Sequence, residues 1–284
     1  HPNVIRLKQI FSSCPNRFNG YKRSCFLVLE YMEHDFLSMM RHITFTEAEV
    51  KRIMLEVLKG VAYLHSQRVI HRDLKGGNLL MNRRGDIKIA DFGLARTQNE
   101  RHMTHNVVTF WYRAPELLLG QASYDEKIDM WSLGCIFGEL MMREILFMGQ
   151  DVAQQLAHIF RRLGNPEREW PDIVLLPHYK EMALASMGEG NLEEAVRKRC
   201  SWASPTAIDL LRRLIAYDPR KRISAEEALQ HEYFTQHPRP CSPSAFNRLQ
   251  GEYHQHLMKA AQQKRKEERP ADTDVEKERP KTEG

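Results

Sequence analysis

The sequence predicts an α+β fold, with short strands in its first part and helices over most of the remainder. Residues 4–11 and 25–31 are short segments rich in Val, Ile, Leu and Phe, and a polar loop separates them, as expected for two β-strands. From residue 46 onward the apolar residues instead recur at intervals of three and four, which is the spacing of one helix face. A run of strands followed by a run of helices is typical of the α+β class.

The first long helix is predicted to begin after Thr46 and to end near residues 65–67. Thr46 and Glu49 fit a capping box, in which each side chain accepts a hydrogen bond from the other residue's backbone N–H. The helix face that would be buried consists of Val50, Ile53, Met54, Val57, Leu58, Val61 and Leu64. A β-hairpin should follow, with strands at 79–82 and 87–90 around the turn RRGD.

The second half of the chain is predicted to be mainly helical. Residues 94–116 lack periodicity and should form a long loop, whereas 128–142 is apolar on nearly every side and should be a helix buried in the core. Two further helices are expected to start at Ser204, where a Pro follows in the first turn, and at Ser224, where SAEE is a second capping box.

Composition and charge exclude several classes of protein. The chain has 284 residues, with 42 Lys and Arg against 37 Asp and Glu, so its formal charge of +5 is too small to indicate nucleic-acid binding. We therefore expect no direct nucleic-acid partner. No apolar run is long enough for a membrane span, so no membrane partner is expected either.

Cysteine usage indicates a reducing compartment. The cysteines are odd in number and widely spaced, and no C-x-x-C pair occurs, which disfavours a zinc site and a framework of disulfides. They are Cys14, Cys25, Cys135, Cys200 and Cys241.

The stretch IHRDLKGGNLLMN, residues 70–82, places an acid, a cation and an amide just before a strand. Asn78 enters the first hairpin strand and Asp91 leaves the second, so the two should lie side by side across the ladder. Amide and carboxylate oxygens are ligands that Mg²⁺ accepts, which predicts a magnesium site. On the same loop, Lys75 would neutralise a transferred phosphoryl group and Asp73 would accept the proton of an attacking hydroxyl.

Each of these fragments alone has a simpler explanation. An Asp after an Arg usually forms an ion pair, and a D-G dipeptide is usually only a turn. The combination of HRDLKGGN, a DFG after a hairpin and an APE at 114–116 is far more specific, because together they form the signature set of protein kinases.

The sequence resembles the eukaryotic protein kinases, and among them the cyclin-dependent kinases, over residues 1 to about 240. It is most similar to the transcription-associated members, such as the cyclin-dependent-kinase-activating kinase of general transcription factor H, and shares features with the PITSLRE type. The resemblance implies the protein-kinase fold, with an N-lobe remnant at 1–31, a mainly α-helical C-lobe at 32–240, and a charged, disordered tail at 241–284.

The resemblance implies transfer of the ATP γ-phosphoryl group, with Mg²⁺, to a protein substrate at Ser or Thr followed by Pro. It makes Asp73 the catalytic base, Lys75 a contact of the γ-phosphate, and Asn78 and Asp91 the Mg²⁺ ligands. Lys75, together with Thr109, is similar to the serine/threonine-specific kinases rather than the tyrosine-specific ones.

Residues 27–35 are similar to the hinge that binds adenine in this family. The resemblance assigns four residues to the nucleotide, in addition to Lys75: the backbone of Glu30 and Met32 at the adenine, Asp35 near the ribose, and Leu80 as the floor of the adenine site. The alternative, that the first part of this segment is only a core strand, is compatible with that role, because the adenine contacts come from the backbone.

The segment MTHNVVTFWYRAPE is similar to the activation segment of the family. Thr104 aligns with the activating phosphosite, and Arg72 and Arg96 with the arginines that gather its phosphate; arginine forks can order a loop around a phosphothreonine. Val107 and Val108 match the substrate-binding stretch of proline-directed kinases.

Three further positions are assigned to architecture rather than to catalysis. Glu116 and Arg222 match a buried ion pair of the family, and Asp129 matches a residue that braces the backbone of the His-Arg-Asp triplet.

No Gly-rich loop, strand-3 lysine or αC glutamate precedes the hinge, because the chain begins at HPNVIRL. We therefore expect an N-terminally truncated chain, and a cyclin partner for the full-length protein. A Lys–Glu pair and a Mg²⁺-binding Asp must both be present for phosphoryl transfer, so a catalytically inactive, kinase-like scaffold is the alternative function.

The kinase interpretation extends to substrates and location. RNA polymerase II C-terminal repeats or other cyclin-dependent kinases are the expected substrates, and the expected location is nuclear, with a cytoplasmic one open beside it. A small-molecule phosphotransferase is disfavoured, because VVTFWYRAPE resembles a segment that binds a peptide.

Overall fold

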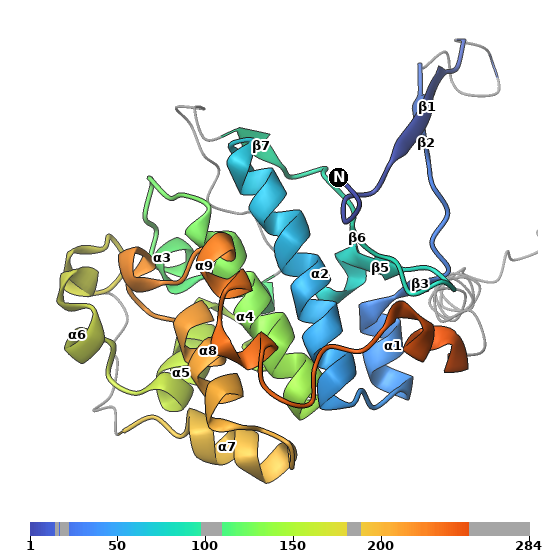
Figure 1. The fold of residues 1–284 in the computed structure, drawn as a ribbon. Coiled ribbons are helices and arrows are strands. Elements are labelled where there is room, and N and C mark those ends of the chain that lie inside the picture. Colours follow the sequence, from blue (N-terminus) through green and yellow to red (C-terminus); the bar gives the residue numbers. More distant parts are fainter. Residues whose placement is uncertain (15–16, 18–22, 98–109, 181–188, 250–284) are drawn as a thin grey trace, which may run out of the picture.

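Helix α2, residues Glu47–Ser66, runs through the body of the molecule, and the other elements are arranged around it (Figure 1). Its predicted capping box is present: Glu49 N–H donates to Thr46 Oγ1 at 3.4 Å, and Thr46 N–H donates to Glu49 Oε2 at 2.8 Å. The structure is a computed structural model that describes residues 1–14, 17, 23–97, 110–180 and 189–249.

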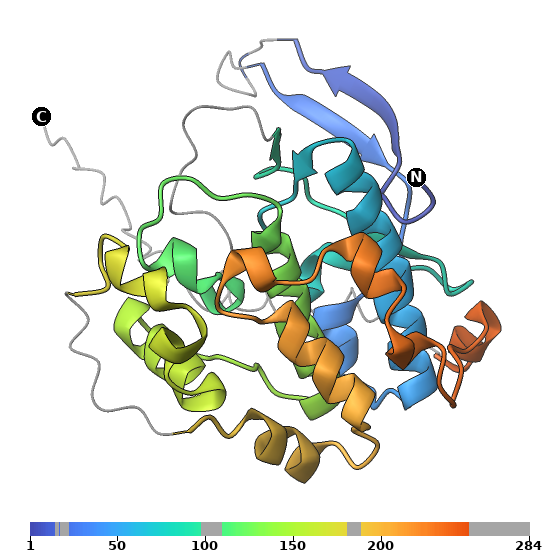
Figure 2. The same ribbon diagram turned by 60° about the vertical axis from the view of Figure 1, so that its left-hand side comes forward.

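The two predicted N-terminal strands are β1, Leu7–Ser12, and β2, Cys25–Leu29, which pair antiparallel with Ile10 opposite Leu27. This β1–β2 ribbon stands at the edge of the molecule in both views (Figures 1 and 2). Its apolar side chains are 37% to 60% exposed: Leu7, Ile10, Phe11, Phe26, Leu27, Val28 and Leu29. At its base, Ile5 N–H donates to the carbonyl of Ile89 at 2.8 Å.

Two small antiparallel sheets lie against α2. The predicted hairpin is confirmed as β5, Leu79–Met81, and β6, Ile87–Ile89, with Leu79 opposite Ile89. Strand β3, His34–Asp35, pairs with the other edge of β5. A separate pair joins β4, Val69–Ile70, to β7, Arg96–Thr97.

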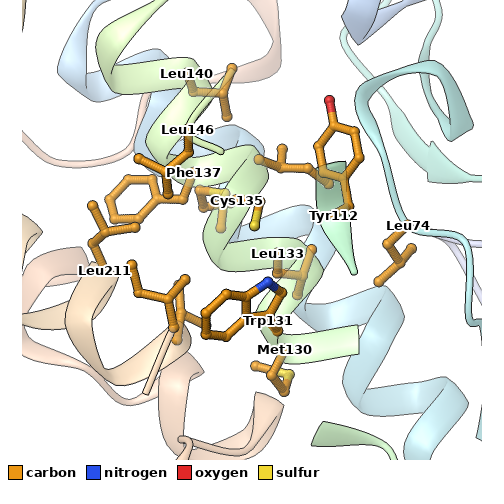
Figure 3. Packing of buried hydrophobic residues seen from close by; sticks show 14 of the residues in the cluster. Leu74, Tyr112, Met130, Trp131, Leu133, Cys135, Phe137, Leu140, Leu146 and Leu211 are labelled. Atoms are coloured by element: carbon orange, nitrogen blue, oxygen red, sulfur yellow. The ribbon is translucent and has the colours of Figure 1, made fainter. Parts of the chain in front are cut away.

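Helix α4, Lys127–Met142, is buried on every side, as its sequence predicts. Figure 3 shows Met130, Trp131, Leu133, Cys135, Phe137 and Leu140 of this helix packed among side chains from other segments, including Leu74, Tyr112, Leu146 and Leu211. Gly134 lets a neighbouring segment approach closely, because a Cβ at this position would collide with Ile215. The helix ends at Met142, where Arg143 takes the left-handed conformation with φ 59°.

The two predicted helix starts in the last third are confirmed, with Ser204 and Ser224 as the N-caps of their helices. The sequence analysis did not predict the other helices. The remaining bounds are α1 Phe36–His42, α3 Pro115–Leu118, α5 Val152–Leu163, α6 Pro166–Glu169, α7 Leu192–Arg199, α8 Pro205–Leu214 and α9 Ala225–Leu229. Of the described residues, none belongs to a helix that is both long and apolar enough to cross a membrane.

The predicted long loop at 94–116 needs a correction, because its described ends hold short elements. Besides β7 and the start of α3, a 3-10 helix covers Phe110–Tyr112. Elements of two to four residues are too short to produce a periodic pattern, which explains why the sequence did not indicate them.

The segment 236–249 crosses the N-terminal part of α2 as a strap. The buried Lys51 ammonium donates to the carbonyls of Gln236 and Pro238 at 3.1 and 2.9 Å. Arg248 forms a forked contact with the Glu49 carboxylate, its Nη2 lying 2.8 Å from Oε1. The predicted tail boundary at residue 241 therefore falls inside a packed segment, and residues 250–284 lie outside the described part.

Glu116 and Arg222 form the buried ion pair predicted for them. Two guanidinium nitrogens of Arg222 reach the two carboxylate oxygens at 2.8 and 3.0 Å, and both side chains are at most 1% exposed. Arg222 also donates to the carbonyl of Lys127 at 2.7 Å and lies over the ring of Trp131. The pair thus connects α3 to the segment that precedes α9.

We expect Glu116→Gln to lower the free energy of unfolding by about 3–5 kcal/mol, because it leaves the Arg222 charge buried without an anion. Urea denaturation measures this loss. The matched control is Arg199→Gln, which removes an exposed pair with Glu144 and should change stability by at most about 1 kcal/mol. Equal effects of the two substitutions would contradict the structural role of the buried pair.

Candidate active site

The loop between β4 and β5 is held in place by one carboxylate of α4, that of Asp129. Asp129 accepts hydrogen bonds from the backbone N–H groups of His71 and Arg72, both at 2.9 Å, and from His65 Nε2 at 3.0 Å. Arg72 has φ 68°, a left-handed conformation that costs energy for a residue other than Gly. The predicted bracing role of Asp129 is therefore seen directly.

Burial by itself would raise the pKa of Asp129. The hydrogen bond and charge of His65 and the backbone N–H of Arg72 outweigh that effect, and the pKa lies below its usual value. The carboxylate is thus kept in the form that accepts all of these hydrogen bonds.

His71 is a neutral positioning residue that the sequence analysis left without a role. Its Nε2 lies 3.0 Å from the carbonyl of Ala90, which can only accept, so Nε2 carries the proton. Its Nδ1 accepts from the backbone N–H of Asp73 at 3.2 Å. Burial lowers the pKa of His71, which agrees with this neutral tautomer. The ring therefore ties the catalytic loop to the end of β6.

The structure brings Asp73, Lys75 and Asn78 together. Lys75 Nζ donates to Asp73 Oδ2 at 2.7 Å, and Asn78 Nδ2 donates to the same oxygen at 3.0 Å and to the Asp73 carbonyl at 2.7 Å. A 3-10 turn, Gly76–Asn78, allows this approach. A Cβ on Gly76 would lie 3.2 Å from the backbone nitrogen of Leu37 and 2.8 Å from the mobile end of the Met40 side chain, so a larger residue would fit only tightly here.

Asp91 lies one residue beyond the ladder partner of Asn78. The N–H of Ala90 donates to the carbonyl of Asn78 at 2.9 Å, so the hairpin aligns Asn78 with Ala90 and delivers Asp91 immediately after. Asp91 is exposed and has φ 63°, and its Oδ1 accepts from Gly93 N–H at 3.3 Å. The prediction that Asn78 and Asp91 are direct partners across the ladder is therefore wrong by one residue, because the strand pairing places Ala90 opposite Asn78.

The donor set of these residues fits Mg²⁺. Asn78 uses its amide nitrogen on Asp73, which leaves the amide oxygen as the atom for a cation, and Asp91 adds a carboxylate. Within the described ranges no cluster of three or more His, Cys, Asp or Glu forms a complete metal site. Magnesium commonly takes one or two carboxylates and completes its shell with water and phosphate oxygens.

Three of the residues assigned to the nucleotide lie in the hinge, and the fourth, Leu80, lies on β5 opposite Asp35. The backbone N–H of Glu30 donates to the carbonyl of Arg6 at 3.0 Å, so any adenine contact of Glu30 falls to its carbonyl. Met32 is 5% exposed, and Leu80 lies half-buried on the opposite face of β5 from its two buried neighbours. Asp35 caps α1 by accepting from Ser38 N–H and Oγ at 2.7 and 2.9 Å. The nucleotide roles of these four residues stay predictions.

The activation assignments are only partly within the described residues. Thr104, Val107, Val108 and Thr109 lie outside them. Arg72 is buried, and donates from Nε to the carbonyl of Leu94 at 2.6 Å and from Nη1 to Tyr124 Oη at 2.9 Å.

Arg96 lies on the strand that pairs with the strand leading to Arg72. Its direct partner in the β4–β7 pair is Ile70, and Ile70 lies two residues before Arg72 in the sequence. The two arginines proposed to gather a phosphate therefore come from adjacent backbone segments. Tyr124, which binds Arg72, is a site residue that the sequence analysis missed, and no motif there indicated it.

Comparison with known protein families shows to which family the chain belongs. The model described as the protein kinase domain matches residues 1–234. The chain belongs to the protein kinase family. The predicted kinase fold and cyclin-dependent type are thereby confirmed, since curated relatives of this kinase carry cyclin-dependent names.

Two curated relatives illustrate the similarity of this kinase. Serine/threonine-protein kinase ppk23 of Schizosaccharomyces pombe is 43% identical over 251 residues, covering 87% of this chain and 61% of the relative. Human cyclin-dependent kinase 11B is 41% identical over 252 residues, covering 87% of this chain and 30% of the relative. The chain therefore spans less than two thirds of the length of these relatives.

Two solved structures share the fold. The yeast RNA Pol II CTD kinase CTDK-1 complex contains a chain with TM-score 0.78 and 33% identity, at 86% coverage of this chain and 79% of that one. The CAK complex of Chaetomium thermophilum bound to ATP-gamma-S gives TM-score 0.77 and 34% identity, at 86% and 75% coverage.

Stability should fall as the pH is lowered from about 6.5, because the unfolded chain protonates His71 whereas the folded kinase resists it. The folded pKa lies below the unfolded one, so this contribution is complete above pH about 6.5 and is lost as pH falls through the folded pKa. Urea unfolding from pH 7.5 to 5 should show a smaller slope for His71→Asn than for the parent. The control is His178→Gln, at an exposed histidine, which should keep the slope of the parent. An unchanged slope in His71→Asn would refute the assignment.

Proposed function

We propose that the protein is a cyclin-dependent-type serine/threonine kinase that transfers the γ-phosphoryl group of ATP to a Ser or Thr hydroxyl followed by Pro. The observation that carries the proposal is the cluster at Asp73, in which a carboxylate, the Lys75 ammonium and the Asn78 amide meet within hydrogen-bond distance. The family match and the cyclin-dependent names of relatives support the same activity.

In this mechanism the substrate hydroxyl attacks the γ-phosphorus and the bond to the ADP leaving group breaks. Asp73 accepts the proton of the hydroxyl, and Lys75 offsets the negative charge on the phosphoryl oxygens. Asn78 fixes the Asp73 side chain and backbone together, so the base does not have to be ordered when the substrate arrives.

Asn78 and Asp91 are the residues that would hold Mg²⁺. When bound, the ion would neutralise charge on the phosphates of ATP. The hinge residues Glu30 and Met32 would receive the adenine through their backbone, with Asp35 and Leu80 beside the ribose and base.

The substrates and partners are proposed from the relatives. The titles of two structural neighbours name an RNA Pol II CTD kinase and a CAK complex, which supports the polymerase C-terminal repeats or other cyclin-dependent kinases as substrates. A cyclin is the proposed partner, and the nucleus the proposed location. Phosphorylation of Thr104 is proposed to order its loop through Arg72 and Arg96.

We expect Asp73→Asn to reduce kcat by about 10²–10⁴-fold, since it removes the general base while keeping the shape of the side chain. The assay uses the chain within its natural full-length protein, with its cyclin, Mg²⁺-ATP and a Ser-Pro peptide. Asp172→Asn, an exposed acid paired with Arg220, is the control and should keep full activity. An Asp73→Asn protein with normal kcat would show that another group accepts the proton.

We expect Mg²⁺-ATP to raise the melting temperature of the chain, because a ligand that binds only the folded state stabilises it. Asp91→Asn should remove the Mg²⁺-dependent part of the shift, whereas Asp172→Asn should keep it. Differential scanning fluorimetry with and without Mg²⁺ measures both. If nucleotide and metal leave the melting temperature unchanged, the chain by itself acts as the non-catalytic scaffold.

A further inference from the structure

The β1–β2 ribbon places two cysteines on one face. Ser12 lies directly opposite Cys25, and Ser13 N–H donates to the carbonyl of Ser24 at 2.9 Å, which extends the pairing by one residue. Cys14 lies two residues past the end of β1, and the alternation of that strand, continued through Ser13, puts Cys14 on the face that Ser12 and Cys25 share. Cys14 and Cys25 are therefore diagonal neighbours across the two strands.

Ideal diagonal positions lie somewhat farther apart than a disulfide spans. Diagonal neighbours in an antiparallel pair are about 7–8 Å apart, and a disulfide joins Cα atoms about 4.4–6.8 Å apart. A shift of about 1 Å closes the difference. Cys14 can make this shift without moving β1, because it lies two residues beyond Ser12, the last residue of that strand.

The two cysteines also differ from the others in accessibility. Cys14 and Cys25 are exposed, whereas Cys135 and Cys200 are buried and Cys241 is half-buried. Burial raises the pKa of the Cys200 thiol to about 11, and it raises that of Cys241 as well. Because the thiolate is the reactive form, an oxidant should react first on the ribbon.

We infer that Cys14 and Cys25 form a reversible redox pair that closes to an intramolecular disulfide. The oxidant is a peroxide: one thiolate attacks hydrogen peroxide, giving a sulfenic acid and releasing hydroxide, which takes a proton to become water. The second thiolate then attacks that sulfur and displaces hydroxide, which takes up the proton that the second thiol lost and becomes a second water. Two thiols and one hydrogen peroxide thus give one disulfide and two waters, and a thiol reductant reverses the step. In a reducing compartment the pair rests as two thiols.

The test treats the whole chain with stoichiometric hydrogen peroxide and maps its cysteines by mass spectrometry without reduction. The expected result is a monomer lighter by two hydrogens, a cross-linked Cys14–Cys25 peptide and full reversal by dithiothreitol. Amide hydrogen exchange of β1 and β2 should slow on oxidation.

Three variants make the test decisive. Cys14→Ser and Cys25→Ser should each abolish the cross-linked peptide and leave the remaining ribbon cysteine to oxidise further or to couple two chains. Cys241→Ser is the matched control and should leave the cross-link unchanged. Disulfide-linked dimers of the parent chain, or sulfinic acid on Cys14 and Cys25 in place of the cross-link, would overturn the inference. None of these readouts depends on kinase activity.

Discussion

The catalytic loop depends on one buried carboxylate, Asp129, in the first turn of the core helix α4. It holds two consecutive backbone N–H groups, of which the second belongs to Arg72 in its left-handed conformation. That conformation turns the chain so that His71 points to β6 and Asp73 to Lys75 and Asn78. Because α4 is enclosed on all sides, the carboxylate has a fixed position, and the geometry of the loop is inherited from the hydrophobic core.

The parts of the proposed site differ in how firmly the structure holds them. Asp73 and Asn78 are buried and joined by several hydrogen bonds, so they form a preorganised unit. Asp91 is exposed, with one short-range contact to Gly93, and lies where a ligand can reach it. The proposed base is thus supported by the core, while the acid proposed to bind metal lies at the surface.

The sequence predicted those elements whose signals are local. The capping boxes at Thr46 and Ser224, the hairpin turn and the apolar helix α4 each require only neighbouring residues, and the structure has all of them. The predicted register of the hairpin was off by one residue at its end, because Asn78 lies opposite Ala90 and Asp91 follows it.

Contacts between distant segments could not be predicted in this way. Tyr124 reaches Arg72 across 52 positions, and nothing in the residues around Tyr124 indicates a partner. The helices α5 and α7 had usable signals, for example the N-cap Asp151 and the apolar spacing after it, which the sequence analysis did not use. The alternative that the first part of the hinge segment is a core strand is wrong, because every residue of β2 is exposed. Burial depends on what surrounds a strand, which its own sequence does not show.

The strap at 236–249 extends the packed part of the chain beyond the residues that match the protein kinase domain. The family match ends at residue 234, yet the two carbonyls that accept hydrogen bonds from the Lys51 ammonium belong to residues 236 and 238. A version of the domain that ended with the match would keep every proposed catalytic group. It would also leave Lys51, inside the central helix, with only Glu47 and the Tyr233 ring beside its charge. The residues that bind the buried Lys51 charge thus extend beyond the end of the region that sequence similarity defines.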